Sequence, residues 1–156
     1  MNTQAAPSWF RAAADTLARR TEGCAVDAAA LLMRHYGLTG EILPLSSEVE
    51  HTADIRLPDG RALILKTATR PEAIESFRFQ SAALGVARGA RGVAIPRVLP
   101  TLDGKPMFVA DGVCGYLQTR LEGDALHRLP QTPQLVFETG AALARLDQAL
   151  AHSDMP

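Results

Sequence analysis

The sequence has few cysteines and no long hydrophobic run. Its 156 residues include only Cys24 and Cys114, which lie far apart and form no Cys-x-x-Cys pattern. This usage favours buried free thiols in a reducing compartment over a structural disulfide. No apolar stretch approaches the roughly 20 residues of a membrane-spanning helix, and the first residues lack the basic start and apolar core of a secretion signal. We therefore expect a cytoplasmic protein without a membrane partner.

A large charge of one sign is also absent. The formal net charge is -1, so the chain creates no bulk field that would attract nucleic acid or an anionic membrane. The four histidines are scattered and none has metal-ligand spacing. The hydrophobic content of 47% is typical of a globular domain, and the length suffices for one domain with a core.

Hydrophobic periodicity and turn residues predict an α+β domain. The predicted helices cover residues 7–20, 26–36, 71–88 and 133–151. The predicted strands cover residues 41–45, 51–57, 61–67, 93–99, 107–110 and 115–121. Three strands precede the helix at 71–88 and two or three follow it. This order predicts a mainly antiparallel, five-stranded sheet with a packed helix, N-terminal helices and a C-terminal helix.

The most informative segment runs from Ile55 to Lys66. Its sequence predicts a strand, a tight Pro58-Asp59-Gly60 turn and a second apolar strand that carries a lysine near its end. An ammonium on an apolar strand needs an anionic partner or a route to water. Two interpretations remain open. Lys66 binds nucleotide phosphates, as the equivalent lysine of kinases does, or it extends from the strand end into solvent.

Six short motifs occur in an informative order and spacing: Gly37-Leu-Thr-Gly40, Leu63-Ile-Leu-Lys66, Phe79-Gln80, Ile95-Pro-Arg-Val98, Tyr116-Leu117 with Leu121-Glu-Gly123, and Leu143-Ala-Arg-Leu-Asp147. Together they resemble the N-terminal lobe of the aminoglycoside phosphotransferase superfamily. The most similar branch contains hydroxylysine kinase and related kinase domains fused to class III aminotransferases. The resemblance covers about residues 28–150. It implies a protein-kinase-like fold, ATP as the cofactor, and phosphotransfer to a hydroxyl of hydroxylysine, an aminoglycoside or choline.

The helix after Lys66 offers a partner for its ammonium. The buried face of this helix is marked by Ile74, Phe77, Ser81 and Leu84. At about 100° per residue, Gln80 lies about 60° from Phe77, whereas Glu75 lies about 160° away and faces solvent. We therefore expect Gln80 to lie near Lys66 and to accept its hydrogen bond through the amide carbonyl. The resemblance agrees, because hydroxylysine kinase-like sequences have glutamine where most kinases have glutamate. The alternative is an ordinary glutamine at the edge of the core.

The resemblance implies two further contacts with ATP. It places the phosphate-covering turn around Ser46 and Ser47, whose hydroxyls and neighbouring N–H groups are candidate phosphate ligands. A polar hairpin is an equally good interpretation, because the family's Asp-Gln-Asn-Phe-like run is replaced here by residues 50–53, Glu-His-Thr-Ala. The resemblance also places Gln118 and Arg120 in the hinge strand, which hydrogen-bonds adenine through its backbone.

The residues that complete phosphotransfer are not evident. Kinases of this superfamily take the base and metal ligands from a His-x-Asp-x-x-x-x-Asn loop and a second aspartate, all in a C-terminal lobe. That complete loop does not occur in the sequence, and Asp111-Gly112 is more typical of a turn than of a metal site. We therefore expect a chain that binds ATP but is incomplete for catalysis, with Mg²⁺ bound only together with the missing lobe.

The expected organisation has three parts. Residues 1–37 form an N-terminal helical segment, residues 38–123 form the kinase-like sheet and helix, and residues 124–156 form a linker and a helix that leads toward a missing C-terminal lobe. Without that lobe the last helix exposes apolar side chains, which predicts self-association or poor solubility. The expected partners are ATP and a C-terminal kinase lobe or a fused enzyme domain. The alternative function is a non-catalytic kinase-like domain that binds proteins or serves as an accessory domain.

Overall fold

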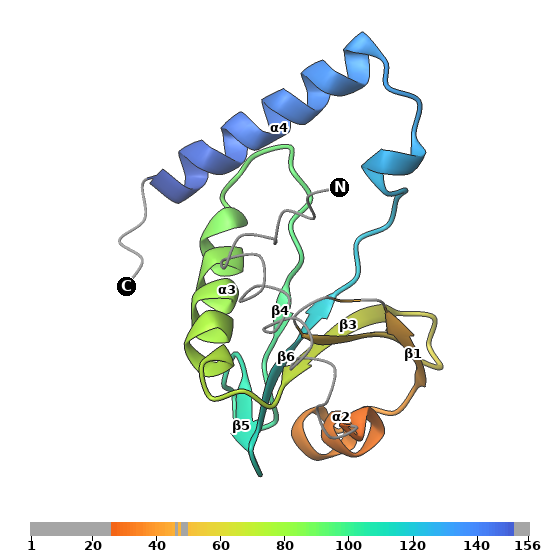
Figure 1. Ribbon diagram of the computed structural model, residues 1–156, viewed down its shortest axis with the longest axis vertical. Helices are drawn as coiled ribbons and strands as arrows, with labels where there is room; N and C mark the ends of the chain where they lie inside the picture. The colour runs from red at the N-terminus through yellow and green to blue at the C-terminus, as the bar shows by residue number, and fades with distance from the viewer. Residues whose placement is uncertain (1–25, 46, 48–49, 152–156) are drawn as a thin grey trace, which may run out of the picture.

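The computed structural model describes residues 26–45, 47 and 50–151 (Figure 1). The predicted helix at 7–20 and Cys24 lie outside the described residues. The elements, in chain order, are α2 (Ala28–Tyr36), β1 (Glu41–Leu45), β2 (His51–Arg56), β3 (Ala62–Ala68), α3 (Ala73–Ala87), β4 (Val98–Leu99), β5 (Phe108–Ala110), β6 (Val113–Thr119), the 3₁₀ helix η1 (Leu126–Arg128) and α4 (Pro133–Ala151). The α+β class is confirmed.

The six strands form one antiparallel sheet. The strand order is β1-β2-β3-β6-β4, and β5 also pairs with β6. The predicted count of five is therefore one strand short. The strand predicted at 93–99 is reduced to the two residues of β4, which lies at an edge. Pro96 precedes β4 and has no N–H to donate to a ladder, so pairing begins only after it.

Local signals define the ends of the elements. Asp27 caps α2, because its Oδ1 accepts hydrogen bonds from the N–H groups of Ala29 and Ala30 at 3.1 and 3.0 Å. Gly37 ends α2 in the left-handed conformation, with φ 64°, as its position predicts. The predicted turn between β2 and β3 is also confirmed, since the Gly60 N–H donates to the Leu57 carbonyl at 3.0 Å.

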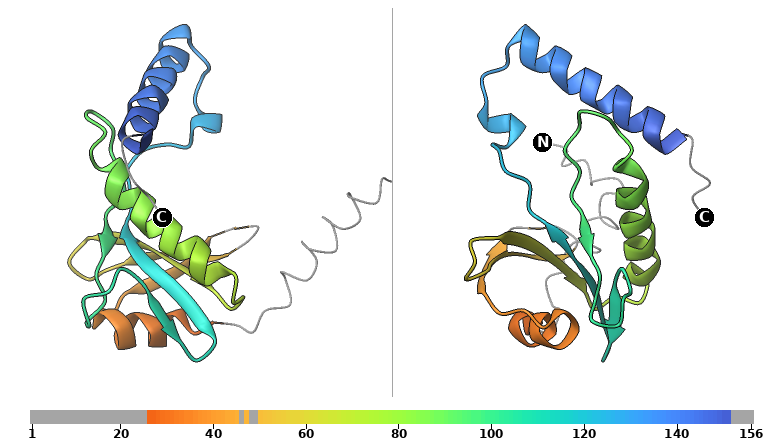
Figure 2. Two further views of the ribbon diagram at one scale, coloured as in Figure 1. Left: turned by 90° about the vertical axis from the view of Figure 1, so that its left-hand side faces the viewer. Right: turned by 180° about the vertical axis from the view of Figure 1, so that it is seen from behind.

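The two faces of the sheet are covered by different helices (Figures 1 and 2). On one face, Leu63 and Leu65 of β3 pack with Leu32 and other residues of α2. On the other face, Phe77 of α3 packs edge-to-face on Tyr116, with ring centroids 5.3 Å apart. Because side chains alternate along a strand, the residues of β3 between the two leucines and after them face α3. This places Lys66 beside α3.

Helix α4 lies outside these layers and contacts α3 (Figure 2). None of its residues is buried, and the apolar side chains of Val136, Phe137 and Leu143 are more than half exposed. Within the described part of the chain, no helix has the length and apolar character needed to cross a membrane.

Candidate functional site

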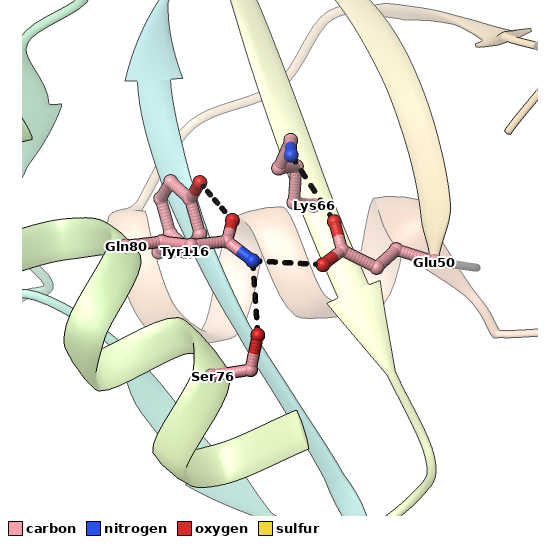
Figure 3. Close-up of polar contacts among 5 residues, drawn as sticks. All are labelled: Glu50, Lys66, Ser76, Gln80 and Tyr116. Carbon is pink, nitrogen blue, oxygen red and sulfur yellow. Dashed lines mark hydrogen bonds and ion pairs between the residues drawn. The ribbon is translucent and has the colours of Figure 1, made fainter.

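Three segments that are distant in sequence meet around Lys66 (Figure 3). The register of the sheet pairs Lys66 with Thr52 of β2 and with Tyr116 of β6. Glu50 stands two residues before Thr52, and Gln80 extends from α3 toward the same point. Lys66, Glu50, Gln80 and Tyr116 therefore form one polar cluster on the α3 face of the sheet.

The ammonium of Lys66 is paired with Glu50. Its Nζ lies 3.1 Å from Glu50 Oε2, and the two side chains are 28% and 12% exposed. A lysine that merely extends into solvent would be more exposed and would need no carboxylate. The structure thus gives Lys66 the anionic partner that an ammonium on an apolar strand requires.

Gln80 reaches Lys66 only through Glu50. Its Nε2 donates to Glu50 Oε1 at 3.0 Å and to Ser76 Oγ at 3.1 Å, while its Oε1 accepts from the Tyr116 hydroxyl at 2.9 Å. A carboxylate only accepts hydrogen bonds, so the amide NH₂ must face Glu50. The expectation that the Gln80 carbonyl accepts from the ammonium is therefore wrong, because that oxygen serves Tyr116.

The helical-wheel prediction for the direction of the side chains is confirmed. Gln80 points into the cluster, whereas Glu75 is exposed and pairs with Arg78 at 2.7 Å. Among the described contacts, the carboxylate beside Lys66 thus comes from the start of β2 and not from α3.

Tyr116 is a fixed donor in this cluster. Its side chain is almost fully buried against Phe77. Burial, followed by the nearby negative charge of Glu50, raises the pKa of Tyr116 to about 12. The hydroxyl therefore stays protonated at neutral pH and holds the orientation of Gln80.

A cleft of about 480 Å³ adjoins the cluster. It lies between the sheet, α3 and the C-terminal half of α4, and Lys66, Gln80 and Gln118 supply its polar groups. The remaining wall is largely apolar and is formed by Phe79, Ala83, Leu84, Ala87, Ile95, Pro96, Tyr116, Leu146 and Leu150. This size and this mixture of an apolar wall with a few polar groups are typical of small-molecule sites.

Of the other predicted nucleotide contacts in the described part of the chain, only Gln118 lies at the Lys66 cleft. Ser46 lies outside the described residues. Ser47 is exposed and lines a separate hollow beside the start of α2, so the structure does not bring it to the Lys66 cleft. The side chain of Gln118 lines the cleft, whereas Arg120 extends toward Asp54, with Nη1 3.5 Å from Oδ2.

The backbone of the predicted hinge is partly used by the sheet itself. The Thr119 N–H donates to the Arg97 carbonyl at 2.9 Å, and the Arg120 N–H donates to the Ala62 carbonyl at 3.1 Å. The amides of Thr119 and Arg120 are therefore already occupied by carbonyl groups of this chain.

Sequence reasoning missed two carboxylates on the α3 face. In the sequence, Glu50 stands out only as part of a departure from a family motif, although it directly precedes the strand that pairs with Lys66. Asp54 is 3% exposed and lies within 4 Å of Arg56 and Arg120. The sequence signal for Asp54 is strand alternation, which places it on the face opposite to Ala53 and Ile55. The register pairs Asp54 with Ile64, two residues before Lys66, so it lies on the same face as Lys66.

Two further observations concern metal and base residues. Residues 26–45, 47 and 50–151 contain no group of three or more His, Cys, Asp or Glu side chains that could hold a metal ion. The sequence does contain one His-x-Asp triplet, His152-Ser153-Asp154, which lies outside the described residues.

A lysine on the third strand, paired with a carboxylate beside the following helix, is an arrangement found in kinases. Residues 41–156 match the model of the phosphotransferase enzyme family (APH), so this chain belongs to that family. The predicted superfamily is confirmed. Hydroxylysine kinase of Danio rerio is 26% identical over 137 residues, which cover 81% of this chain and 38% of that protein.

Two solved structures share the fold. The amicoumacin kinase hAmiN, in complex with AMP-PNP, Ca²⁺ and Ami, has a TM-score of 0.66 at 13% identity, over 83% of this chain and 42% of that one. The spectinomycin phosphotransferase APH(9)-Ia, in complex with ADP and spectinomycin, has a TM-score of 0.62 at 11% identity, over 82% and 37%. This chain therefore spans about two fifths of the length of each of these relatives.

Proposed function

We propose that this chain is the nucleotide-binding lobe of an ATP-dependent kinase that phosphorylates a hydroxyl of a small molecule, of the hydroxylysine, aminoglycoside or choline kinase type. The observation that carries the proposal is the ammonium of Lys66. A carboxylate holds it, and its side chain lines a cleft of about 480 Å³. The nucleotides printed for the two structural neighbours, AMP-PNP and ADP, support ATP as the ligand.

Lys66 is proposed to bind the ATP phosphates. An ammonium has three N–H donors, and Glu50 accepts only one of them. Among the contacts described for residues 26–45, 47 and 50–151, Lys66 makes no other side-chain hydrogen bond, and we propose that its other donors form charge-assisted hydrogen bonds with phosphate oxygens. Because Lys66 lies inside a paired strand, its position changes little when the ligand binds.

The apolar part of the cleft is proposed to hold the adenine ring. Ile95, Pro96 and Leu84 supply apolar surface, and Gln118 lies beside them. Since the N–H groups of Thr119 and Arg120 serve the sheet, we propose that adenine contacts the side chain of Gln118, which lines the cleft, and not these two amides.

The base and the Mg²⁺ ligands are proposed to come from residues outside this chain. The support is the absence of a complete His-x-Asp-x-x-x-x-Asn pattern from the sequence. The exposed apolar side chains of Val136, Phe137 and Leu143 on α4 support a partner surface, which would be a C-terminal lobe, a fused domain or a second copy.

Calorimetry with ATP tests the role of Lys66. Wild type should bind ATP, and Lys66→Ala should raise the dissociation constant by about 10- to 100-fold, because each charge-assisted hydrogen bond contributes about 1.5–3 kcal/mol. Lys105 is the matched control, since it is the only other lysine in the sequence and its ammonium pairs with Asp103 in an exposed turn. Lys105→Ala and Glu75→Ala should bind like wild type.

Two outcomes would contradict the proposal. If wild type and Lys66→Ala bind ATP equally, the nucleotide does not use this lysine. If the purified chain phosphorylates hydroxylysine with ATP, and Lys66→Ala abolishes this activity, the chain is complete for catalysis and the assignment of the base to another segment is wrong.

A further inference from the structure

The carboxylate that holds Lys66 comes from an unexpected element. In protein kinases the lysine of the third strand pairs with a glutamate of the following helix. Here that helix presents Gln80, and the carboxylate of Glu50, at the entry to β2, lies 3.1 Å from the ammonium. Glu75 of the helix is exposed and pairs with Arg78, so it is not an alternative.

We infer that Glu50 is the positioning residue that orients Lys66 for the nucleotide phosphates, and that Gln80 and Tyr116 hold Glu50 in place. This inference rests on the proposed function. Glu50 does not touch the nucleotide in this role; it acts through the ammonium.

The order of donors and acceptors in the cluster supports this assignment. The Tyr116 hydroxyl donates to Gln80 Oε1, which leaves the Gln80 NH₂ group for Glu50 Oε1. The other carboxylate oxygen, Oε2, is then left for Lys66. Each hydrogen bond in this series fixes whether the next group donates or accepts, so the ammonium is held in place before any ligand binds. Such preorganisation improves affinity because less side-chain freedom is lost on binding.

The cluster also links three elements that would surround a phosphate group. Glu50 belongs to the chain that enters β2, Lys66 lies in β3 and Gln80 lies in α3 (Figure 3). Glu50 therefore connects Lys66 of β3 to α3 through Gln80, a connection that the helix glutamate makes directly in other kinases.

The donor pattern makes a sharp exchange experiment possible. In Glu50→Gln, the new side chain has one acceptor oxygen, but Lys66 and the Gln80 NH₂ group both need one. In Gln80→Glu, two carboxylates would face each other where the present N–O distance is 3.0 Å. In the double variant Glu50→Gln/Gln80→Glu, the amide of residue 50 donates to residue 80 and its carbonyl accepts from Lys66. All of the hydrogen bonds among residues 50, 66, 80 and 116 are then restored.

The experiment measures ATP and adenosine binding to the purified chain by calorimetry. We expect Glu50→Gln and Gln80→Glu each to raise the ATP dissociation constant about tenfold, the loss of one interaction of about 1.4 kcal/mol. The double variant should return to within about threefold of wild type. Adenosine has no phosphate, so its affinity should change less than about twofold in all variants. Urea unfolding of each variant checks that it is folded.

The possible failures are distinguishable. If wild type does not bind ATP, the proposed function fails and this inference fails with it. If wild type binds ATP and Glu50→Gln binds it equally well, only the role of Glu50 is overturned. If the affinities for ATP and adenosine fall together, or the double variant gives no recovery, Glu50 is structural and the inference is also wrong.

Gln80→Leu, which keeps Glu50 but removes the amide that holds it, is the second measurement if Glu50→Gln does not fold. This variant should raise the dissociation constant for ATP severalfold and leave that for adenosine unchanged. An unchanged dissociation constant for ATP would overturn the inference.

Discussion

Removing the Tyr116 hydroxyl tests whether the polar cluster stabilises the fold. Tyr116→Phe keeps the ring and therefore keeps the edge-to-face contact with Phe77, at 5.3 Å between centroids. It removes only the donor to Gln80 Oε1, which is 2.9 Å away. The substitution thus isolates one hydrogen bond.

The expected loss follows from the burial of the two partners. A neutral hydrogen bond contributes about 0.5–1.5 kcal/mol to the free energy of unfolding. Gln80 is only half-buried, so water can replace the lost donor and the loss should stay near 1 kcal/mol. For a chain of this size, 1 kcal/mol corresponds to a decrease in Tm of about 2–4 °C.

Tyr36→Phe is the matched control. The Tyr36 oxygen accepts the N–H of Leu117 at 3.1 Å in the buried core, at the place where the partner of β6 changes from β5 to β4. Removing it leaves a buried backbone donor without its partner, which costs about 1–3 kcal/mol. Urea unfolding should therefore rank wild type above Tyr116→Phe, and Tyr116→Phe above Tyr36→Phe.

Two results would refute this reasoning. Tyr116→Phe could be as stable as wild type, in which case the hydroxyl does not hold Gln80. A double-mutant cycle with Gln80→Leu could show additive effects, whereas a real contact should give a coupling of about 0.5 kcal/mol or more.

Two further predictions concern pH and close packing. Burial raises the pKa of both tyrosines in the sequence, that of Tyr116 to about 12. An unfolded tyrosine is half ionised near pH 10, so ultraviolet titration at that pH should show little tyrosinate in the folded chain. Because the unfolded state loses these protons first, the free energy of unfolding should be intact below about pH 10 and should fall as the pH rises toward 12; a tyrosinate signal near pH 10 from a fully folded chain would contradict this. Gly115→Ala should lower the free energy of unfolding by about 2 kcal/mol or more in urea, since its Cβ would lie 2.5 Å from the Lys66 carbonyl oxygen. Gly85 occupies an exposed position of α3, and a Cβ there meets no atom within 4 Å, so Gly85→Ala should raise that free energy by about 0.5–1 kcal/mol. Equal effects of the two substitutions would be inconsistent with the packing.

Features that depend on near neighbours in the chain were predictable. The alternation of β3 placed Lys66 on the face opposite to Leu63 and Leu65, and the helical wheel placed Gln80 inward and Glu75 outward. Capping and turn signals marked the ends of α2 and the bend before β3. These rules work because the periods of 2 and 3.6 residues depend only on backbone geometry.

Strand pairing limited the prediction of the sheet. The segment before β4 looks like a strand, but only Val98 and Leu99 pair, because an edge strand needs a partner with free donors and acceptors. The hinge was affected in the same way. Whether the amides of Thr119 and Arg120 are free for adenine depends on Arg97 and Ala62, which no local pattern places beside them.

By itself, the sequence determined the family-like order of strands and helices, the presence of a lysine on β3 and the face to which that lysine points. Only the tertiary structure decided which carboxylate meets it. Glu50 is 16 residues from Lys66 in the chain, and Gln80 and Tyr116 are 30 and 36 residues from their partners in the cluster. A local period fixes the direction of a side chain, whereas the group it meets there depends on how separate elements pack and pair.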